Sequence, residues 1–352
     1  MKVAAFLALI AALPGAGSAS TANPVLVLHP TSSVAIQGFD GRLDADGRRA
    51  AAIGGCGIDL WKPGARKTTF VQPCRYTRRV DFAGVDEVAL AGDRLAWIRE
   101  ESISHGMRFQ TELVVKAGSR KAREIASAYD DSGFGAYLIG LDGDGDTLAF
   151  AWHYSFDEDV QEQVFRISRT DDAGACPVES DGLLPNPPQA FFCVDTSLPL
   201  GSVESVSQGR ILVSFGDLLG VVERGNSEHD LPIPFSVDDD VAVLAGAEVV
   251  VVHERGSTLD VYDSLTGSSS KRWPIPLAAE IGPVSVAGGF AVYSSNGIRL
   301  VRLRDGRIRK LQIPRGKRPV AAALEPAGLF VLYRTKHGER LGFVPMQRLR
   351  KW

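Results

Sequence analysis

Short apolar segments alternate with turn-forming residues along most of the chain, in a pattern that recurs seven times. Each copy has a short apolar segment, a turn rich in Gly or Asp, and a second, more strongly apolar segment. Apolar segments of this length predict β-strands, and Gly and Asp between them predict tight turns. The copies are "RLDADGRRAAAIG" (42–54), "VALAGDRLAWIR" (88–99), "GLDGDGDTLAFAW" (140–152), "SVSQGRILVSF" (205–215), "AVLAGAEVVVVHE" (242–254), "SVAGGFAVYS" (285–294) and "AALEPAGLFVLYR" (322–334).

The spacing of the copies matches the length of a propeller blade. Four of the six steps between the turn glycines are 37 to 45 residues long, and steps around forty are typical of four-stranded blades. The two longest steps lie around the segment that holds Cys176 and Cys193, as expected of an insertion. We therefore predict an all-β fold, a single seven-bladed β-propeller over residues 23–352. The marker glycines are Gly47, Gly92, Gly145, Gly209, Gly246, Gly288 and Gly328.

Several copies are followed by a strand that proline closes. Proline cannot donate a hydrogen bond to a neighbouring strand, so it is tolerated at the end of an edge strand, such as the outermost strand of a blade. The last copy lacks such a strand, and "VLVLHP" (25–30) has the same pattern. We predict that residues 25–30 close the last blade, because ring closure removes exposed sheet edges. The proline-closed segments are "FVQP" (70–73), "LPIP" (231–234), "WPIP" (273–276) and "LQIP" (311–314).

In repeat length and strand pattern, the chain resembles the β-propeller superfamily, most closely secreted seven-bladed propellers of the YVTN-type and TolB-like kinds, which are WD-repeat-like. The resemblance covers essentially the whole chain after the first 22 residues. The GH…WD pair of WD repeats is absent. The resemblance therefore implies the fold, and it implies no particular function.

The stretch "DGDGD" (142–146) places three aspartates at alternate positions and raises the question of a calcium loop. An EF-hand loop needs Gly at its sixth position and a carboxylate at its twelfth. Counted from Asp142, these positions hold Thr147 and His153. Tight turns also select Asp and Gly, so we predict a plain turn in the third blade and no cofactor. The alternative is a looser calcium site that adds the acidic residues at 157–159.

The beginning of the chain, "MKVAAFLALIAALPGAGSAS", has the pattern of a secretory signal peptide. Lys2 is followed by an apolar run and then by small residues. The apolar run is shorter than the roughly 20 residues that cross a bilayer. We predict a signal peptide over residues 1–22, with cleavage after Ala19 or Ala22, and an exported protein of the periplasm or the extracellular medium.

Four cysteines in an exported chain predict two disulfides, for which three pairings exist. Nearest-neighbour pairing would join Cys56 to Cys74 and Cys176 to Cys193. A metal site is the alternative, but CxxC spacing is absent. The Pro- and Gly-rich segment 172–193 predicts an irregular, disulfide-tied loop inserted in the third blade. A long loop on a rigid scaffold is a suitable place for recognition.

Charge is distributed unevenly, although the formal net charge is −3. Residues 130–263, the acidic arc, hold 26 acidic and 5 basic residues, whereas residues 299–352, the basic arc, hold 15 basic and 3 acidic residues. Such a field can orient a charged partner, which suggests a protein or an anionic polymer of the cell envelope. Export and the lack of an aromatic-interleaved basic stripe argue against nucleic acid. The alternative is a set of solvated strand faces.

No nucleophile, zinc-protease or phosphate-loop motif occurs in the sequence, so we predict no catalytic residue and no metal ligand. Ligand sites of propellers gather around the central channel. The polar residues expected there, as candidate partner-binding residues, are Asp86, Glu87, Glu204, Asp238, Asp239, Asp240, Lys317 and Arg318. We therefore favour a monomeric binding or scaffold module over an enzyme. The alternative is a metal-assisted hydrolase or lactonase with carboxylates around the channel.

If "DGDGD" is a plain turn, neither calcium nor a chelator changes the melting temperature of the protein. A cation that binds only the folded state would stabilise it in step with its concentration. Thermal unfolding with calcium, and then with excess chelator, measures this. A rise in melting temperature that the chelator reverses would support the calcium site instead.

Overall fold

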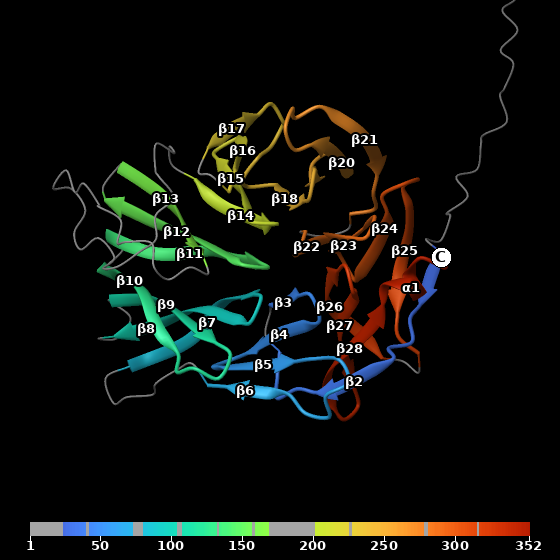
Figure 1. Cartoon of the computed structure of the whole chain (residues 1–352), viewed down its shortest axis with the longest axis horizontal. Coiled ribbons are helices and arrows are strands. Elements are labelled where there is room, and N and C mark those ends of the chain that lie inside the picture. Colours follow the sequence, from blue (N-terminus) through green and yellow to red (C-terminus); the bar gives the residue numbers. More distant parts are fainter. Residues whose placement is uncertain are drawn as a thin grey trace, which may run out of the picture.

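Seven blades surround one central axis in the computed structural model, with the first strand of every blade innermost (Figure 1). The strands of a blade follow one another outward from the centre and pair antiparallel. The predicted all-β, seven-bladed propeller is therefore confirmed. The structure describes residues 24–39, 42–72, 80–103, 108–131, 134–156, 159–168, 201–224, 227–277, 281–314 and 317–352.

The first three blades are built from the N-terminal half of the chain. The first blade contains β3 (Leu43–Asp46), β4 (Arg49–Gly54), β5 (Gly57–Trp61) and β6 (Thr69–Val71). The second contains β7 (Val80–Ala91), β8 (Arg94–Ile103), β9 (Arg108–Ala117) and β10 (Arg123–Asp131). The described strands of the third are β11 (Phe134–Asp144), β12 (Thr147–Phe156) and β13 (Asp159–Ser168). The second and third blades are joined where β10 and β11 pair over two residues.

The C-terminal half supplies the other four blades. The fourth contains β14 (Ser202–Ser207), β15 (Arg210–Phe215), β16 (Leu218–Val222) and β17 (Glu228–Leu231). The fifth contains β18 (Asp240–Ala245), β19 (Glu248–His253), β20 (Thr258–Asp263) and β21 (Ser269–Pro274). The sixth contains β22 (Val284–Ala287), β23 (Phe290–Ser294), β24 (Ile298–Arg302) and β25 (Arg307–Gln312). The seventh contains β26 (Arg318–Glu325), β27 (Gly328–Thr335) and β28 (Gly338–Pro345), and the short helix α1 (Met346–Leu349) follows it.

The turns between first and second strands fall where the glycine markers predict them. Five of the marker glycines directly follow the first strand of their blade, with φ between +57° and +62°. Glycine adopts this left-handed conformation without the steric cost that other residues meet. In the fourth blade Gln208 takes that conformation, with φ +53°, and Gly209 follows it. The five are Gly47, Gly92, Gly145, Gly246 and Gly288.

Proline-closed segments end the outermost strands of the fourth and fifth blades, as predicted. In the sixth blade β1 (Val25–Val27) lies outside β25, so "LQIP" (311–314) does not follow the outermost strand there. In the fifth blade Pro274 is the last residue of β21, and in the fourth Pro232 comes directly after β17. The isoleucine of each "IP" pair is buried, as Ile233, Ile275 and Ile313 show. Proline thus ends hydrogen bonding at the outer edge while its neighbour anchors the connection to the next blade.

The N-terminal segment closes the ring, but the closing strand lies later than predicted. β2 (Ser32–Ala35) pairs antiparallel with β28 and completes the seventh blade, whereas β1 (Val25–Val27) pairs parallel with β25 of the sixth. The predicted segment 25–30 is therefore divided between two blades.

Pro30 marks this division. Leu28 N donates to Gln312 O of the sixth blade, and Thr31 N donates to Phe343 O of the seventh, both at 2.8 Å. Pro30, between them, has no N–H to donate. A Cβ on Gly342 would lie only 3.0 Å from the Pro30 ring, so glycine at that position leaves room for the crossing.

Every blade packs between two neighbours, so its second strand is apolar on both faces. In β19, Val249 and Val251 join a cluster with Leu212 of the fourth blade. Val250 and Val252 point to the other face and join a cluster with Ala291 of the sixth. All four valines are fully buried. Continuous apolar runs in the second strands are therefore required by packing on both sides.

Polar side chains on the first strands bind one blade to the next. The acceptor stands two residues before the end of its strand, and the donor is a backbone N–H near the end of the next first strand. The shared geometry occurs at four interfaces: Leu90 N donates to Asp44 Oδ2 (2.6 Å), Val206 N to Asp142 Oδ2 (2.5 Å), Leu244 N to Ser205 Oγ (2.7 Å), and Leu324 N to Ser285 Oγ (2.8 Å).

The last residue of the first strand, two positions after the first acceptor, makes a second link of the same kind. Its side chain accepts a hydrogen bond from the backbone N–H that begins the turn of the next blade. In the third blade, Asp142 and Asp144 make the two links together, which gives the stretch "DGDGD" a structural role. The donor–acceptor pairs are Gly92–Asp46 (2.5 Å), Gln208–Asp144 (2.7 Å), Gly246–Ser207 (3.2 Å) and Gly47–Glu325 (2.9 Å).

We predict that Asp142→Ala lowers the free energy of unfolding by about 1–3 kcal/mol, because the Val206 N–H loses its acceptor. Urea unfolding at pH 7 measures the change. Asp217→Ala, at an exposed turn position, is the matched control and should stay within about 0.5 kcal/mol of wild type. Equal losses in the two variants would contradict the role given to Asp142.

Candidate functional site

Carboxylates gather at the end of the channel where the turns between first and second strands lie, here termed the turn end. Asp44 and Asp46 come from β3, Asp142 and Asp144 from β11, and Glu325 from β26. Burial raises the pKa of Asp142 to about 7. Burial also raises the pKa of Glu325 to about 8, and the negative charges of Asp46, Asp144 and Asp142 add to the rise. The carboxylates therefore lie close enough to repel one another.

All five turn-end carboxylates accept backbone hydrogen bonds from the following blade. Their arrangement follows from the links between blades, so they need no ligand to explain it. Across the described ranges, no group of three or more His, Cys, Asp or Glu side chains is arranged to hold a metal ion.

The predicted residues of the second blade have different surroundings. Glu87, on β7, is buried and accepts hydrogen bonds from Gly140 N, at 3.2 Å, and from Leu141 N of the third blade. Its Oε1 also lies 3.2 Å from Arg42 Nη1. Asp86 is exposed on the same strand. Glu87 thus supplies the link between the second and third blades, where β7 has alanines at the usual linking positions.

Asp240 belongs to a polar network that crosses the fifth blade. His253 Nδ1 lies 2.9 Å from Asp240 Oδ2, and His253 Nε2 lies 3.7 Å from Asp260 Oδ2. Asp260, fully buried, also accepts hydrogen bonds from Tyr262 OH (3.1 Å) and Arg272 Nε (2.7 Å). Every one of the four strands contributes at least one residue, so the network holds the strands of this blade together.

The remaining predicted residues are spread over the fourth, fifth and seventh blades. Asp239 accepts from Ser236 Oγ (3.1 Å) and pairs with Arg255 (2.8 Å), while Asp238 beside it is exposed. Glu204, in β14, accepts a hydrogen bond from Ser214 Oγ at 2.7 Å. Lys317 Nζ lies 5.4 Å from the centre of the Tyr333 ring. Arg318 is exposed at the start of β26.

No hydrogen bond or ion pair in the described part of the chain joins two of the eight predicted residues from different blades. The structure therefore does not bring them together as one bonded site. Their role in partner binding stays a prediction.

Some predicted features lie outside the described residues. Cys56 lies in the turn between β4 and β5. Both predicted disulfides and the predicted insertion stay predictions. The features outside the described ranges are the signal peptide (1–22), the loop 172–193, Cys74, Cys176 and Cys193. Among the residues that the structure describes, no helix is long and apolar enough to cross a membrane.

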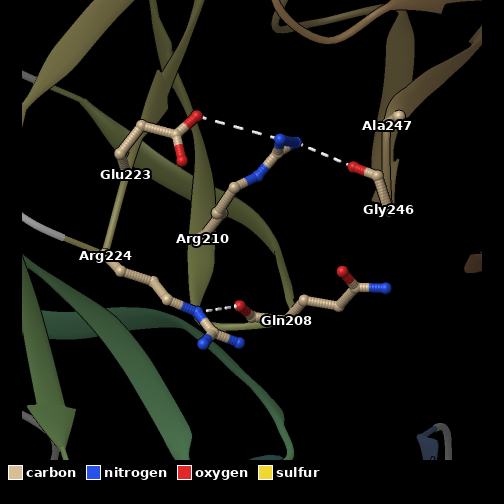
Figure 2. Close-up of a pocket in the computed structure, with 6 residues that line it drawn as sticks. All are labelled: Gln208, Arg210, Glu223, Arg224, Gly246 and Ala247. Atoms are coloured by element: carbon tan, nitrogen blue, oxygen red, sulfur yellow. Dashed lines mark hydrogen bonds and ion pairs between the residues drawn. The ribbon is translucent and has the colours of Figure 1, made fainter.

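A polar pocket of about 550 Å³ lies between the fourth and fifth blades (Figure 2). The turn between β14 and β15 and the end of β16 form one wall, and the turn between β18 and β19 forms the other. The lining residues are Gln208, Arg210, Glu223, Arg224, Gly246 and Ala247. We term this the arginine pocket.

Arg210 spans the arginine pocket and joins its two walls. Its Nη2 donates to Gly246 O (2.7 Å) and to Ser264 Oγ (2.8 Å) of the fifth blade. Its Nη1 lies 3.8 Å from Glu223 Oε1 on the opposite wall. Figure 2 shows the side chain reaching across to Gly246. Arg210 is therefore fixed in place by both blades.

Behind the pocket, Arg166 of β13 supports the end of β16. It donates to Glu223 O (2.8 Å), to Arg224 O (2.9 Å) and to Val222 O (3.3 Å). Burial lowers the pKa of Arg166, the Glu223 carboxylate raises it, and the positive charge of Arg224 lowers it further. Three guanidinium groups and one carboxylate are thus gathered here.

Arg224 is the exposed cation of the arginine pocket. Its Nε donates to Gln208 O at 2.5 Å, and its side chain lies over Gly209. Neither terminal nitrogen donates a hydrogen bond to a described residue. Gln208 is exposed beside it, at a left-handed turn position. An arginine fork fixed at Nε can offer Nη donors to a carboxylate or phosphate, with a side-chain amide as an additional donor.

This pocket was not predicted from the sequence, although the sequence contains one signal for it. Arginine begins the second strand in three copies of the repeat, at Arg49, Arg94 and Arg210. All three donate to a carbonyl in the turn of the next blade. Aligning the copies would have revealed this position. Arg224 and Gln208 occur in turns without such a repeat.

Comparison with solved structures supports the fold, through a match with a TM-score above 0.5. No protein-family model matches the chain, and no curated protein matches it. The β-propeller domain of Cps50 (Swd1) from Myceliophteria thermophila is similar to it, with 10% identity over 90% of this chain and 98% of that one, at a TM-score of 0.53. AztD from Citrobacter koseri gives 11% identity over 77% and 85% of the two chains, with a TM-score of 0.41. A chain of the mitotic checkpoint complex is 9% identical in sequence. The match covers 97% of this chain and 99% of that one, with a TM-score of 0.48.

The turn-end carboxylates predict a stability that falls as pH rises. Asp142 and Glu325, with pKa values of about 7 and about 8, bind protons more tightly in the folded chain than in the unfolded one, where carboxyl pKa values are near 4. Unfolding therefore releases protons between about pH 4 and pH 8, which lowers stability across that window. We expect the melting temperature to be higher at pH 5.5 than at pH 8.

Glu325→Gln tests the origin of this trend, because Gln keeps an oxygen to accept from Gly47 N but does not titrate. Its melting temperature should fall less between pH 5.5 and pH 8 than that of wild type. An equal fall in both proteins would show that Glu325 is not responsible.

Proposed function

We propose that this chain is a binding or scaffold module that holds an anionic group of its partner in the arginine pocket. The observation that carries the proposal is the exposed Arg224 fork, which lines the pocket, is fixed at Nε, and has its terminal nitrogens beside Gln208. The partner is a protein with an exposed carboxylate or phosphate, or an anionic polymer of the envelope.

The surroundings make Arg224 suited to this role. Arg166 and Arg210 are committed to carbonyl groups, so they supply positive charge and rigidity without adjusting to a ligand. Arg224 is exposed, and its terminal nitrogens are available to an anionic group that enters the pocket. Binding groups held in place before the partner arrives lose less conformational entropy on association.

The position of the pocket within the acidic arc favours recognition over short distances. Residues 130–263 hold 26 acidic residues and only 5 basic ones, three of which are Arg166, Arg210 and Arg224. A polyanion approaching this part of the ring would be repelled over most of the surface. A single anionic group at the pocket meets cations at close range, where screening by salt is weakest.

The basic arc gives less support to an envelope-polymer site. Many of its cations already have partners within the ring. Arg302 pairs with Asp305 (2.5 Å), and Arg334 pairs with Glu339 (2.9 Å). Arg340 donates to Ser33 O (3.3 Å). These contacts are typical of charged residues on solvated strand faces, which is the alternative interpretation of the basic arc given above.

We also propose that the chain is exported and contains two disulfides. Support comes from the signal-peptide pattern of residues 1–22 and from the even number of cysteines. Cys56 and Cys74 flank β5 and β6, so a bond between them would hold the outer half of the first blade. Mass mapping of the non-reduced protein, isolated from the periplasm and the medium separately, tests both statements.

We predict that Arg224→Gln weakens partner binding by about 10–100-fold, the range for losing charge-assisted hydrogen bonds. Tagged wild-type protein and the variant are purified from their native envelope and medium at low and at high salt, and copurifying macromolecules are quantified. A stoichiometric partner should be retained by wild type and released by salt.

Arg255→Gln is the matched control, since it removes another exposed arginine of the acidic arc, which pairs with Asp239 away from the pocket. This variant should retain the partner. Equal retention by all three proteins would overturn the arginine pocket as the binding site. Absence of any reproducible partner would count against the binding module itself.

A further inference from the structure

Arg299 is a buried cation in the sixth blade, and it belongs to neither the arginine pocket nor the links between blades. It lies on β24 and is only 7% exposed. Its neighbours across the sheet are Tyr293 on β23 and Lys310 on β25. Directly paired residues of antiparallel strands point to the same face, so these three side chains form a row on one side of the blade.

The Arg299 guanidinium has two nitrogens that lack the partners a buried charge requires. Its Nε and Nη1 are buried and make no hydrogen bond, and no ion pair of the described part of the chain includes Arg299. A buried cation without partners is strongly unfavourable, and natural proteins almost always pair it. The orphaned nitrogens therefore indicate that a group not seen in the polypeptide completes this site.

The surroundings define what that group can be. Alternation along β24 places Arg299 on the same face as Val301, which packs with Tyr293 and Ile275 at the boundary with the fifth blade. Tyr293 OH donates to Pro276 O at 3.3 Å, and burial raises the pKa of Tyr293, so it is a neutral donor. The site is largely apolar around its cation, which increases the strength of an electrostatic contact.

Lys310 provides a second positive charge beside Arg299. The two residues are directly paired across β24 and β25, and the end of the Lys310 side chain lies beside Gly297, in the turn that precedes β24. No acidic residue within the described ranges forms an ion pair with Lys310. Two unpaired cations next to each other repel, and an anion between them would remove both the repulsion and the unmet hydrogen bonding.

We infer that Arg299 and Lys310 form a binding site for a small oxyanion, a phosphate or a carboxylate group, at the boundary between the fifth and sixth blades. The buried position of Arg299 admits a small group and excludes the flat surface of a macromolecule. The site is separate from the arginine pocket, which lies between the fourth and fifth blades.

Thermal unfolding at constant ionic strength tests the inference, with sodium phosphate, sodium acetate and sodium chloride as the probes. Wild type should melt about 2–4 °C higher at saturating concentrations of the preferred oxyanion than in chloride. A response to phosphate alone identifies a phosphate site, and a response to acetate identifies a carboxylate site. An equal melting temperature in all three salts would overturn the inference.

Variants locate the response. Arg299→Met keeps a similar length without charge, so it should melt higher than wild type in chloride and lose the oxyanion response. Arg299→Lys keeps the charge but not the fork, and Lys310→Gln removes the second cation, so each should respond less than wild type. Arg224→Gln should respond as wild type does, which separates this site from the proposed function. A full response in Arg299→Met would overturn the inference.

Glu280→Gln tests an internal alternative, since Glu280 is an acidic residue between Ile275 and Arg299 in the sequence, outside the described ranges. If Arg299 binds an external oxyanion, this variant and wild type should respond alike. An oxyanion response that appears only after Glu280 is neutralised would show that the chain's own carboxylate fills the site, and would overturn the inference.

Discussion

The hydrogen bond from a backbone N–H of one first strand to a side-chain oxygen on the preceding blade is the contact on which the rest of the ring depends. Apolar packing between blades is not directional, so it would tolerate sliding of one sheet over the next. The links at Asp142, Ser205 and Ser285 fix the height of each first strand against its neighbour. With the first strands fixed, the turns, the pocket between them and the channel all have defined positions.

These links also explain why negative charge accumulates around the channel. Aspartate and serine side chains both accept the backbone hydrogen bond from the next blade, but only aspartate adds a negative charge. The first and third blades use aspartate, and Glu325 of the seventh blade points to the first. Burial raises the pKa values of Asp142 and Glu325, and repulsion from the neighbouring carboxylates adds to the rise. The arginine pocket differs, because Arg224 has donors that no described residue of the ring accepts.

Local chemistry made most of the fold predictable from sequence. Gly47, Gly92 and Gly145 mark turns because they adopt a left-handed backbone, and Pro232 and Pro274 mark outer strands because they cannot donate. The closing strand was placed several residues early, since the division at Pro30 depends on Gly342, which lies 312 positions away in the sequence. Periodicity within one segment carries no information about such a contact.

The candidate site was less predictable for a similar reason. Glu87 and Asp240 are polar residues of first strands, and composition alone allows each to face the channel. The bulge beside Glu87 directs it to backbone N–H groups of the third blade, and Asp240 pairs with His253 within the fifth blade. Arg224 becomes notable only when Gln208 and Gly246 stand around it, and these belong to two different blades.

The division of the N-terminal segment between two blades has a consequence for the order of folding. β2 is synthesised well before its partner β28, since Thr31 and Phe343 are 312 positions apart in the sequence. The other blades can form in sequence as the ribosome releases them, but the seventh needs both β2 and β28. Closing so long a loop is slow compared with forming hairpins. Until Ser32–Ala35 docks, the β28 edge is unpaired and exposed to association with other chains.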